Sequence, residues 1–256
     1  MKKYFYLILF FPLLNANIFA QNKYNFSQFY DESVQFVKQP LKWEGNDWLK
    51  FGTLAAGTFL ISFADQPVRD AVLKDQSYVK TAPELVGRYW GQGYATGLFA
   101  AGFGLHGLIT NDQLSKKIGF EIIQATIYSV GLTEIFKTVL GRARPYTNEG
   151  SSSFHPLAIL KYDHNSFSSG ETATAFSLST VLANNTKSAL LKVICYIPAI
   201  LTASSRIYRN EHWVSDVFFG AALGYFVGNW VSNVHQEKET SIQMSSAYPL
   251  TLQIKL

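Results

Sequence analysis

Residues 217–234, VFFGAALGYFVGNWVSNV, decide the fold of this chain. The segment is apolar, and a glycine recurs at every fourth position, at Gly220, Gly224 and Gly228. Residues four apart lie on one face of an α-helix, so the three glycines form a stripe without side chains. Such a stripe allows another helix to approach closely. The segment therefore predicts a helix that packs tightly against a neighbouring helix.

Further helix-like segments precede this one along the chain. They are separated by polar stretches, and the chain has no internal repeat and no low-complexity linker. They span residues 51–64, 65–90, 91–110, 118–136, 172–185 and 188–205. We therefore expect one all-α domain over residues 48–235, a bundle of about six core helices. A polar segment at 21–47 precedes it, and a polar tail at 236–256 follows it, in which 248–256 has the pattern of a short strand.

Composition leaves two environments open for this bundle. Hydrophobic residues make up 48% of the chain and charged residues only 16%, whereas about a quarter of the residues are charged in an ordinary soluble domain. Among the apolar segments, only 91–110 and 217–234 approach the roughly 20 residues that a membrane span needs. We expect a bundle that is embedded in a membrane or associated with one. A periplasmic bundle with a very apolar core is the alternative.

The first twenty residues, MKKYFYLILFFPLLNANIFA, have the pattern of a secretory signal. A basic start, a short apolar run and a small residue at the end are typical of such segments. We expect residues 1–20 to be removed and the protein to be exported to a bacterial cell envelope.

The formal net charge of +4 is too small to indicate a nucleic-acid partner. The single cysteine, Cys195, excludes a disulfide within the chain.

Three short polar stretches lie at helix ends or in loops between the apolar segments. Residues 137–145 read KTVLGRARP, residues 168–171 read SSGE, and residues 205–216 read SRIYRNEHWVSD. In a helical bundle the three stretches can converge at one end. Their residue types then decide which chemistry that end supports.

The first chemical feature is a set of cations around a serine-glycine turn. Lys137, Arg144 and Arg206 supply positive charges, and guanidinium forks match phosphate oxygens. The turn at Ser169 and Gly170 enters a helix, whose first N–H groups and positive dipole end also attract an anion. These residues predict an oxyanion site. The alternative is a solvated basic loop or a headgroup anchor.

The second chemical feature is the pair His212 and Asp216. Because they are four residues apart, they share a face on a helix, and the carboxylate can hold one imidazole nitrogen. The other nitrogen is then free to act as a nucleophile. Beside a phosphate site, such a histidine suggests a covalent phosphohistidine. Taken alone, His212 next to Trp213 is also typical of a membrane interface.

Together, the three stretches resemble the type 2 phosphatidic acid phosphatase superfamily, which also contains bacterial class A acid phosphatases and vanadium haloperoxidases. The first stretch matches the family's first motif, which is lysine, six residues, then arginine and proline. The third stretch matches the third motif, which is serine-arginine, five residues, histidine, three residues, then aspartate. The resemblance covers roughly residues 48–235, and the motifs lie between 137 and 216.

The resemblance implies a metal-free phosphoryl transfer that needs no cofactor. It implies that His212 attacks phosphorus and that Asp216 orients and polarises His212. Water then hydrolyses the phosphohistidine. By the same resemblance, the phosphate oxygens are held by Lys137, Arg144, Ser169, the Gly170 amide and Arg206.

The second stretch departs from the family pattern. The family's second motif reads Pro-Ser-Gly-His, and its histidine protonates the leaving alcohol, whereas this chain has Glu171 at that position. In one hypothesis Glu171 is the general acid, which requires a raised pKa. In a second, Ser168 and Glu171 form a capping box, and the acid is His164, His155 or water. In a third, the protein binds phosphate without turnover.

We expect altered but retained activity, because the nucleophile, its carboxylate and the phosphate cradle are all present. The leading hypothesis is a phosphatase that hydrolyses phosphate or diphosphate esters of a lipid at a membrane surface. A soluble periplasmic acid phosphatase of broad specificity and a non-catalytic phosphate-binding protein are the alternatives. Losing a general acid costs about 10² to 10⁴ in rate. The loss matters least for good leaving groups, so we expect diphosphates to be favoured over alkyl monophosphates.

Overall fold

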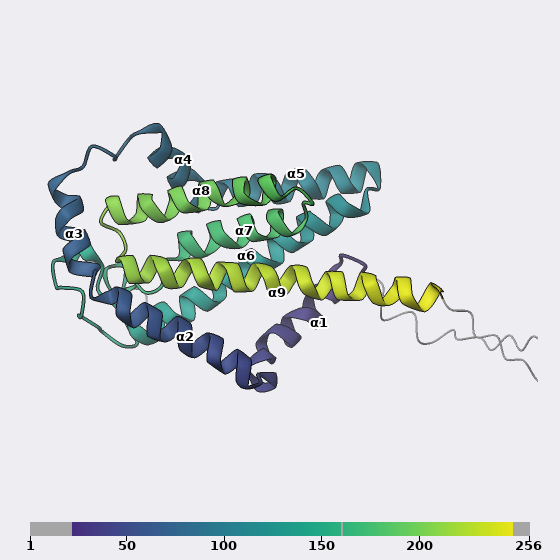
Figure 1. The fold of residues 1–256 in the computed structure, drawn as a ribbon, viewed down its shortest axis with the longest axis horizontal. Coiled ribbons are helices and arrows are strands. Elements are labelled where there is room, and N and C mark those ends of the chain that lie inside the picture. Colours follow the sequence, from purple (N-terminus) through teal and green to yellow (C-terminus); the bar gives the residue numbers. More distant parts are fainter. Residues whose placement is uncertain (1–21, 160, 248–256) are drawn as a thin grey trace, which may run out of the picture.

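The computed structural model describes residues 22–159 and 161–247, and in these residues the chain is all-α (Figure 1). The predicted fold class is thereby confirmed; the nearest approach to a strand in these ranges is an isolated bridge between Arg142 and Phe154. The α-helices are α1 (Phe26–Val37), α2 (Gly45–Ser62), α3 (Asp65–Lys74), α4 (Ala82–Gly91), α5 (Tyr94–Thr110), α6 (Gln113–Leu140), α7 (Gly170–Asn184), α8 (Ala189–Tyr208) and α9 (Val214–Ala247). The described residues also form short 3-10 helices, η1 (Gln39–Lys42), η2 (Pro145–Thr147) and η3 (Tyr162–His164).

Helix α7 is the centre of the bundle. In Figure 1 it lies between α8 and α9, with α6 behind it, and it contacts all three. Its sequence, GETATAFSLSTVLAN, consists mostly of small residues, and most of them are buried. Small side chains let neighbouring helices approach from several sides. The main apolar core forms where Ile122 of α6, Leu178 of α7 and Val231 of α9 meet.

The glycine stripe of α9 faces α7, in agreement with the prediction of close helix packing. A Cβ atom added at Gly220 would lie 2.6 Å from the carbonyl oxygen of Ser169, and one at Gly224 would lie 2.1 Å from that of Ala173. At Gly228 the nearest atom would be the Cβ of Thr180, at 2.8 Å. These distances are shorter than any side chain tolerates, so the three glycines set how closely α9 approaches α7.

Segments on both sides of the predicted domain 48–235 also form helices of the structure. The segment 21–47 contains α1, whose Glu32 is fully buried and accepts a hydrogen bond from Gln124 of α6 at 2.8 Å. Helix α9 continues past residue 235 to Ala247. The predicted boundaries at residues 48 and 235 therefore do not coincide with breaks between elements. The predicted signal at 1–20 and the predicted strand at 248–256 lie outside the described residues.

In the described part of the chain, only α8 combines the length and the apolar composition of a membrane span. Of its apolar window, 22% is buried against the rest of the protein. This differs from the sequence-based expectation, which named residues 91–110 and 217–234. The first of these forms a helix of 17 residues, α5, and the second is the first half of the 34-residue α9, whose second half is polar.

Candidate active site

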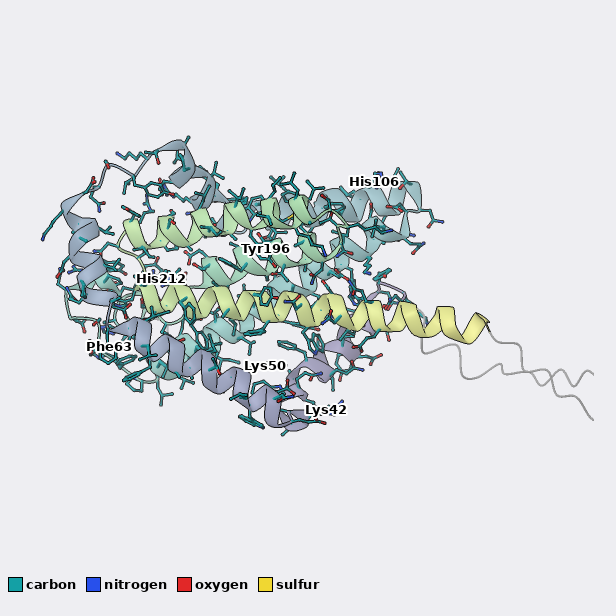
Figure 2. All side chains as sticks on the ribbon, in the orientation of Figure 1. Lys42, Lys50, Phe63, His106, Tyr196 and His212 are labelled. Carbon is teal, nitrogen blue, oxygen red and sulfur yellow. The ribbon has the colours of Figure 1, made fainter. Side chains whose placement is uncertain are left out.

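The three polar stretches meet at one end of the bundle. His212 precedes the first turn of α9 (Figure 2), and Glu171 lies in the first turn of α7. Arg206 lies in the last turn of α8, and Lys137 in the last turn of α6. The amide N–H of Ser169 donates to the carbonyl oxygen of Asp216 at 3.2 Å, which joins the starts of α7 and α9.

His212 is held by a backbone carbonyl. Its Nδ1 lies 2.8 Å from the carbonyl oxygen of Ser166, and the ring is buried. A carbonyl only accepts hydrogen bonds, so Nδ1 carries the proton, and in the neutral imidazole Nε2 carries the free lone pair. Nε2 has no hydrogen-bond partner among the described residues. This is the arrangement that a nucleophilic histidine requires.

Asp216 does not make the hydrogen bond to His212 that its spacing predicts. Its Oδ2 lies 3.9 Å from His212 Nδ1, which is beyond hydrogen-bond distance. The carboxylate instead accepts from the hydroxyl of Ser166, from the amide of Trp213 at 3.0 Å and from Arg142 Nη1 at 2.6 Å. The carbonyl of Ser166 therefore makes the hydrogen bond to His212 that was predicted for Asp216, and Asp216 in turn holds the hydroxyl of Ser166.

A buried network behind Asp216 was missed by the sequence analysis. Arg142 bridges Asp216 and Asp65 of α3, with Nη2 2.7 Å from the Asp65 carboxylate. Asp65 also accepts from the amide of Ser215 at 2.9 Å and from its hydroxyl at 2.6 Å. The side chains of Arg142, Asp65 and Asp216 are almost completely buried. The only signal in the sequence was the position of Arg142, two residues before Arg144 in the first polar stretch.

Arg206 offers unsatisfied donors next to His212. Its Nη1 contacts the Glu171 carboxylate at 3.1 Å. Its Nε and Nη2 are buried and have no hydrogen-bond partner among the described residues. Burying a charged donor without an acceptor is costly. The two nitrogens therefore favour an anion at this position.

Lys137 lies beside the turn at the start of α7. Its Nζ would be 3.3 Å from a Cβ atom added at Gly170, which places the ammonium group next to the backbone of that turn. Nζ also forms an ion pair with Glu134 at 2.8 Å. The structure therefore brings Lys137, Ser169 and Gly170 together, as the sequence predicted.

Arg144 is already engaged by the protein. Its Nε and Nη2 donate to the side-chain oxygen of Asn165, Nε also donates to the carbonyl of Tyr162, and Nη1 pairs with Glu211 at 3.0 Å. The guanidinium group lies 4.1 Å from the centre of the Tyr162 ring. A phosphate at Arg144 would have to exchange with these partners. In this arrangement Arg144 fixes the loop between α6 and α7.

Glu171 faces the site and does not form the predicted capping box. The N-cap of α7 is Ser169, whose hydroxyl accepts from the amide of Thr172. The carboxylate of Glu171 lies 3.1 Å from Arg206 and 3.4 Å from Nε2 of His212. Burial raises the pKa of this carboxyl, but the protonated form of His212 and Arg206 lower it by more, so its pKa lies well below the ordinary value. Glu171 is therefore ionised near neutral pH.

The two loop histidines that sequence analysis offered as substitute acids contact another carboxylate. Nε2 of His155 lies 2.7 Å and Nε2 of His164 3.0 Å from the carboxylate of Glu149. Hydrogen bonds from His155, His164 and Ser153 lower the pKa of Glu149 to about 2. Both histidines thus have a local partner within the loop.

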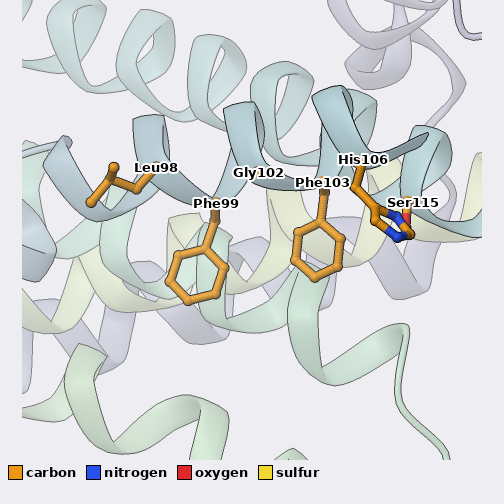
Figure 3. Close-up of a pocket in the computed structure, with 6 residues that line it drawn as sticks. All are labelled: Leu98, Phe99, Gly102, Phe103, His106 and Ser115. Carbon is orange, nitrogen blue, oxygen red and sulfur yellow. The ribbon is translucent and has the colours of Figure 1, made fainter. Parts of the chain in front are cut away.

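An apolar hollow of about 460 Å³ lies elsewhere in the molecule. It is lined by residues of α5 and the start of α6: Leu98, Phe99, Gly102, Phe103, His106 and Ser115 (Figure 3). His106 lies toward the opposite end of the bundle from His212 (Figure 2). The hollow has no arginine or lysine in its lining, so its chemistry does not suit a phosphate.

The region that holds the site matches a known family. The family model of the PAP2 superfamily matches residues 119–240. Lipid A 1-phosphatase of Porphyromonas gingivalis is 41% identical over 92 residues, which cover 34% of this chain and 21% of that protein. Undecaprenyl-diphosphatase of Sulfolobus acidocaldarius is 27% identical over 138 residues, which cover 53% of this chain and 59% of that protein. The chain thus spans less than two thirds of either curated relative.

A solved structure of a transmembrane PAP2 type phosphatidylglycerolphosphate phosphatase from Bacillus subtilis is also similar. It aligns with a TM-score of 0.47 and 17% identity, covering 72% of this chain and 95% of that one. The region matched by the family model contains the three polar stretches that converge in the structure. Residues 119–240, slightly less than half of the chain, thus match the PAP2 superfamily.

Proposed function

We propose that this protein is a phosphatase that hydrolyses phosphate or diphosphate esters of a lipid through a phosphohistidine. The observation that carries the proposal is the pairing of His212 with Arg206. The lone pair of His212 Nε2 and two unpartnered guanidinium nitrogens of Arg206 are buried, and both side chains contact Glu171. A nucleophile next to donors without acceptors is what the attack on a phosphate monoester requires.

The reaction follows from the tautomer of His212. The Nε2 lone pair attacks phosphorus, the bond from phosphorus to the ester oxygen breaks, and the leaving oxygen takes a proton. A water oxygen then attacks phosphorus, the N–P bond breaks with its electron pair returning to Nε2, and inorganic phosphate leaves. Arg206, Lys137 and the amide of Gly170 stabilise the charge on the phosphate oxygens. The carbonyl of Ser166 keeps the ring oriented throughout.

Glu171 has a distinct part in this proposal. Its carboxylate neutralises Arg206 until a phosphate group displaces it from between Arg206 and His212. Because its surroundings keep it ionised, it supplies no proton to the leaving group, which takes one from water. Substrates whose leaving group is itself a good anion then react best, so diphosphates are favoured over alkyl monophosphates.

We place the reaction at a bacterial envelope membrane, and two observations support a lipid substrate at a membrane. The two curated relatives are named for lipid A and for undecaprenyl diphosphate. Large apolar side chains are also exposed along α8, which suits contact with lipid: Leu190, Leu191, Val193, Ile194, Ile197 and Ile200. Extraction tests this point, because a membrane-associated protein needs detergent for release. Full release by salt or freeze-thaw would favour the alternative of a soluble periplasmic acid phosphatase.

The proposed activity is tested with detergent-purified protein, a chromogenic phosphate ester and matched lipid mono- and diphosphates. We expect release of inorganic phosphate that vanadate inhibits, with a higher kcat/KM for the diphosphate. Equal or faster turnover of the alkyl monophosphate would contradict the assignment of Glu171.

A second candidate function, phosphate binding without turnover, is supported by the ionised Glu171. Saturable phosphate binding with no hydrolysis of any substrate would establish it.

A further inference from the structure

Three potential metal ligands come together in the loop between α6 and α7. Glu149 follows η2, His155 lies further along the loop, and His164 ends η3. One ligand atom from each residue lies within 4.8 Å of the other two. All three side chains are accessible to solvent to some degree, with 35%, 44% and 19% of their side-chain surface exposed, respectively. The cluster contains none of the residues proposed for phosphoryl transfer.

The geometry directs both imidazoles at one carboxylate. Nε2 of His155 lies 2.7 Å from one oxygen of Glu149, and Nε2 of His164 lies 3.0 Å from the other. The two rings are stacked, with centroids 3.8 Å apart and an angle of 20° between their planes. Both Nε2 atoms therefore lie on the same side of the cluster as the Glu149 carboxylate, where a single ion could contact all three side chains.

The donor set selects the kind of metal. Two imidazole nitrogens and one carboxylate form a typical three-ligand zinc site with an open fourth position. Calcium and magnesium prefer oxygen ligands alone. The hydroxyl of Ser153 donates to the Glu149 carboxylate at 2.9 Å, and such outer hydrogen bonds hold ligand carboxylates in place. We propose that Glu149, His155 and His164 bind a zinc ion.

The proposed ion joins segments that shape the wall of the phosphate site. The amide of His155 donates to the carbonyl of Gly141 at 2.7 Å, and His164 directly precedes Asn165, which accepts from Arg144. Zinc at this cluster thus ties the two sides of the loop together close to Arg144. In this proposal the ion holds the loop, because none of its three ligands takes part in the proposed phosphoryl transfer.

The test is a zinc titration of the full chain, purified in detergent with an affinity tag that contains no histidine and stripped with EDTA. We expect one zinc ion per chain by elemental analysis and by titration against a competing chelator. Loss of an outer partner of a metal ligand alone weakens binding about 10- to 100-fold. The double variant His155→Ala/His164→Ala, which lacks two direct ligands, should therefore bind at least about 100-fold more weakly.

Two further variants keep the proposal falsifiable. Glu149→Gln is nearly isosteric and should weaken zinc binding at least about tenfold, since an amide oxygen is a poorer ligand than a carboxylate. His106→Ala removes a histidine outside the cluster and should bind like the wild type. The proposal is overturned if the stripped wild type takes up no zinc at micromolar concentration. It is equally overturned if the double variant binds with wild-type affinity.

Discussion

At the residue scale, Glu171 distinguishes this chain from the family pattern. The carboxylate stands where a histidine is expected, and it contacts both Arg206 and the proposed nucleophile, His212. Its two neighbours favour its charged form, so the residue that replaces the acid is poorly suited to donate a proton. Local sequence indicated a helix cap, whereas the structure shows a carboxylate that faces the proposed phosphate position.

Substitution of Glu171 separates its possible roles. We expect Glu171→His to raise the turnover of an alkyl monophosphate, because an imidazole with a pKa of about 6.5 is readily protonated near neutral pH. The turnover of a diphosphate should change much less. The measurement is kcat/KM for both substrates, with Glu171→Gln as the isosteric control. A fall in alkyl monophosphate turnover in both variants would show that the carboxyl itself is the working acid.

The same residue predicts a pH dependence of stability. The pKa of Glu171 is lowered on folding from its ordinary value of 4.5, so the folded protein favours the carboxylate. Its stabilising contribution is then fully present above the ordinary pKa and is lost as the pH falls through the lower, folded-state value. The difference in Tm between wild type and Glu171→Gln should be constant from about pH 6 to 8 and shrink below about pH 4. A difference that already disappears between pH 8 and pH 6 would disagree with this assignment.

At the element scale, the position of α9 against α7 depends on three glycines. A methyl group at Gly224 would overlap the carbonyl of Ala173, and overpacking of this kind costs about 1–3 kcal/mol. At Gly131, in the interior of α6, an added Cβ has no atom within 4 Å. Gly224→Ala should therefore destabilise the protein, whereas Gly131→Ala should stabilise it by up to about 1 kcal/mol. Unfolding measurements that give the two variants the same shift would contradict this packing.

Arg142 connects three elements behind the proposed nucleophile, His212. It joins the loop that carries it to Asp65 of α3 and Asp216 of α9. Arg142→Met leaves both carboxylates buried and unpaired, so we expect a loss of about 3–5 kcal/mol together with a lower kcat. Lys50→Met is the matched control, since the Lys50–Asp47 pair is exposed and should contribute less than about 1 kcal/mol. Similar losses in the two variants would argue against a buried network.

Sequence reasoning reached the elements that have a local signal. The glycine stripe at Gly220, Gly224 and Gly228 predicted tight packing, and fixed spacings indicated His212 and Arg206. Helix α1 lies in the segment that the sequence indicated only as polar, and its buried Glu32 has its partners in α6 and α9, as much as 203 residues away. The network of Arg142 likewise depends on pairings between distant segments, such as Arg142 with Asp65. A local pattern carries no information about such partners.

At the scale of the whole molecule, the proposed phosphate site lies at one end of the bundle, and large apolar side chains are exposed along its sides. The proposed phosphate site lies at the end where α7 and α9 begin. The sides of α5, α6 and α8 expose large apolar side chains, among them Leu108, Ile127 and Ile197. This arrangement would let a lipid tail remain in a membrane while its phosphate reaches His212. The sequence-based expectation named residues 91–110 and 217–234, whereas among the described helices α8 has the length and apolar composition of a span.

The central claim is that His212 is the nucleophile. The most direct test is the rate of phosphate release from a lipid diphosphate by His212→Ala, compared with wild type and with His106→Ala as a control at the other end of the bundle. Removing a nucleophile typically lowers kcat by about 10⁴-fold or more. We predict a loss of that size for His212→Ala and wild-type turnover for His106→Ala. Turnover by a folded His212→Ala protein within tenfold of the wild type would contradict the account.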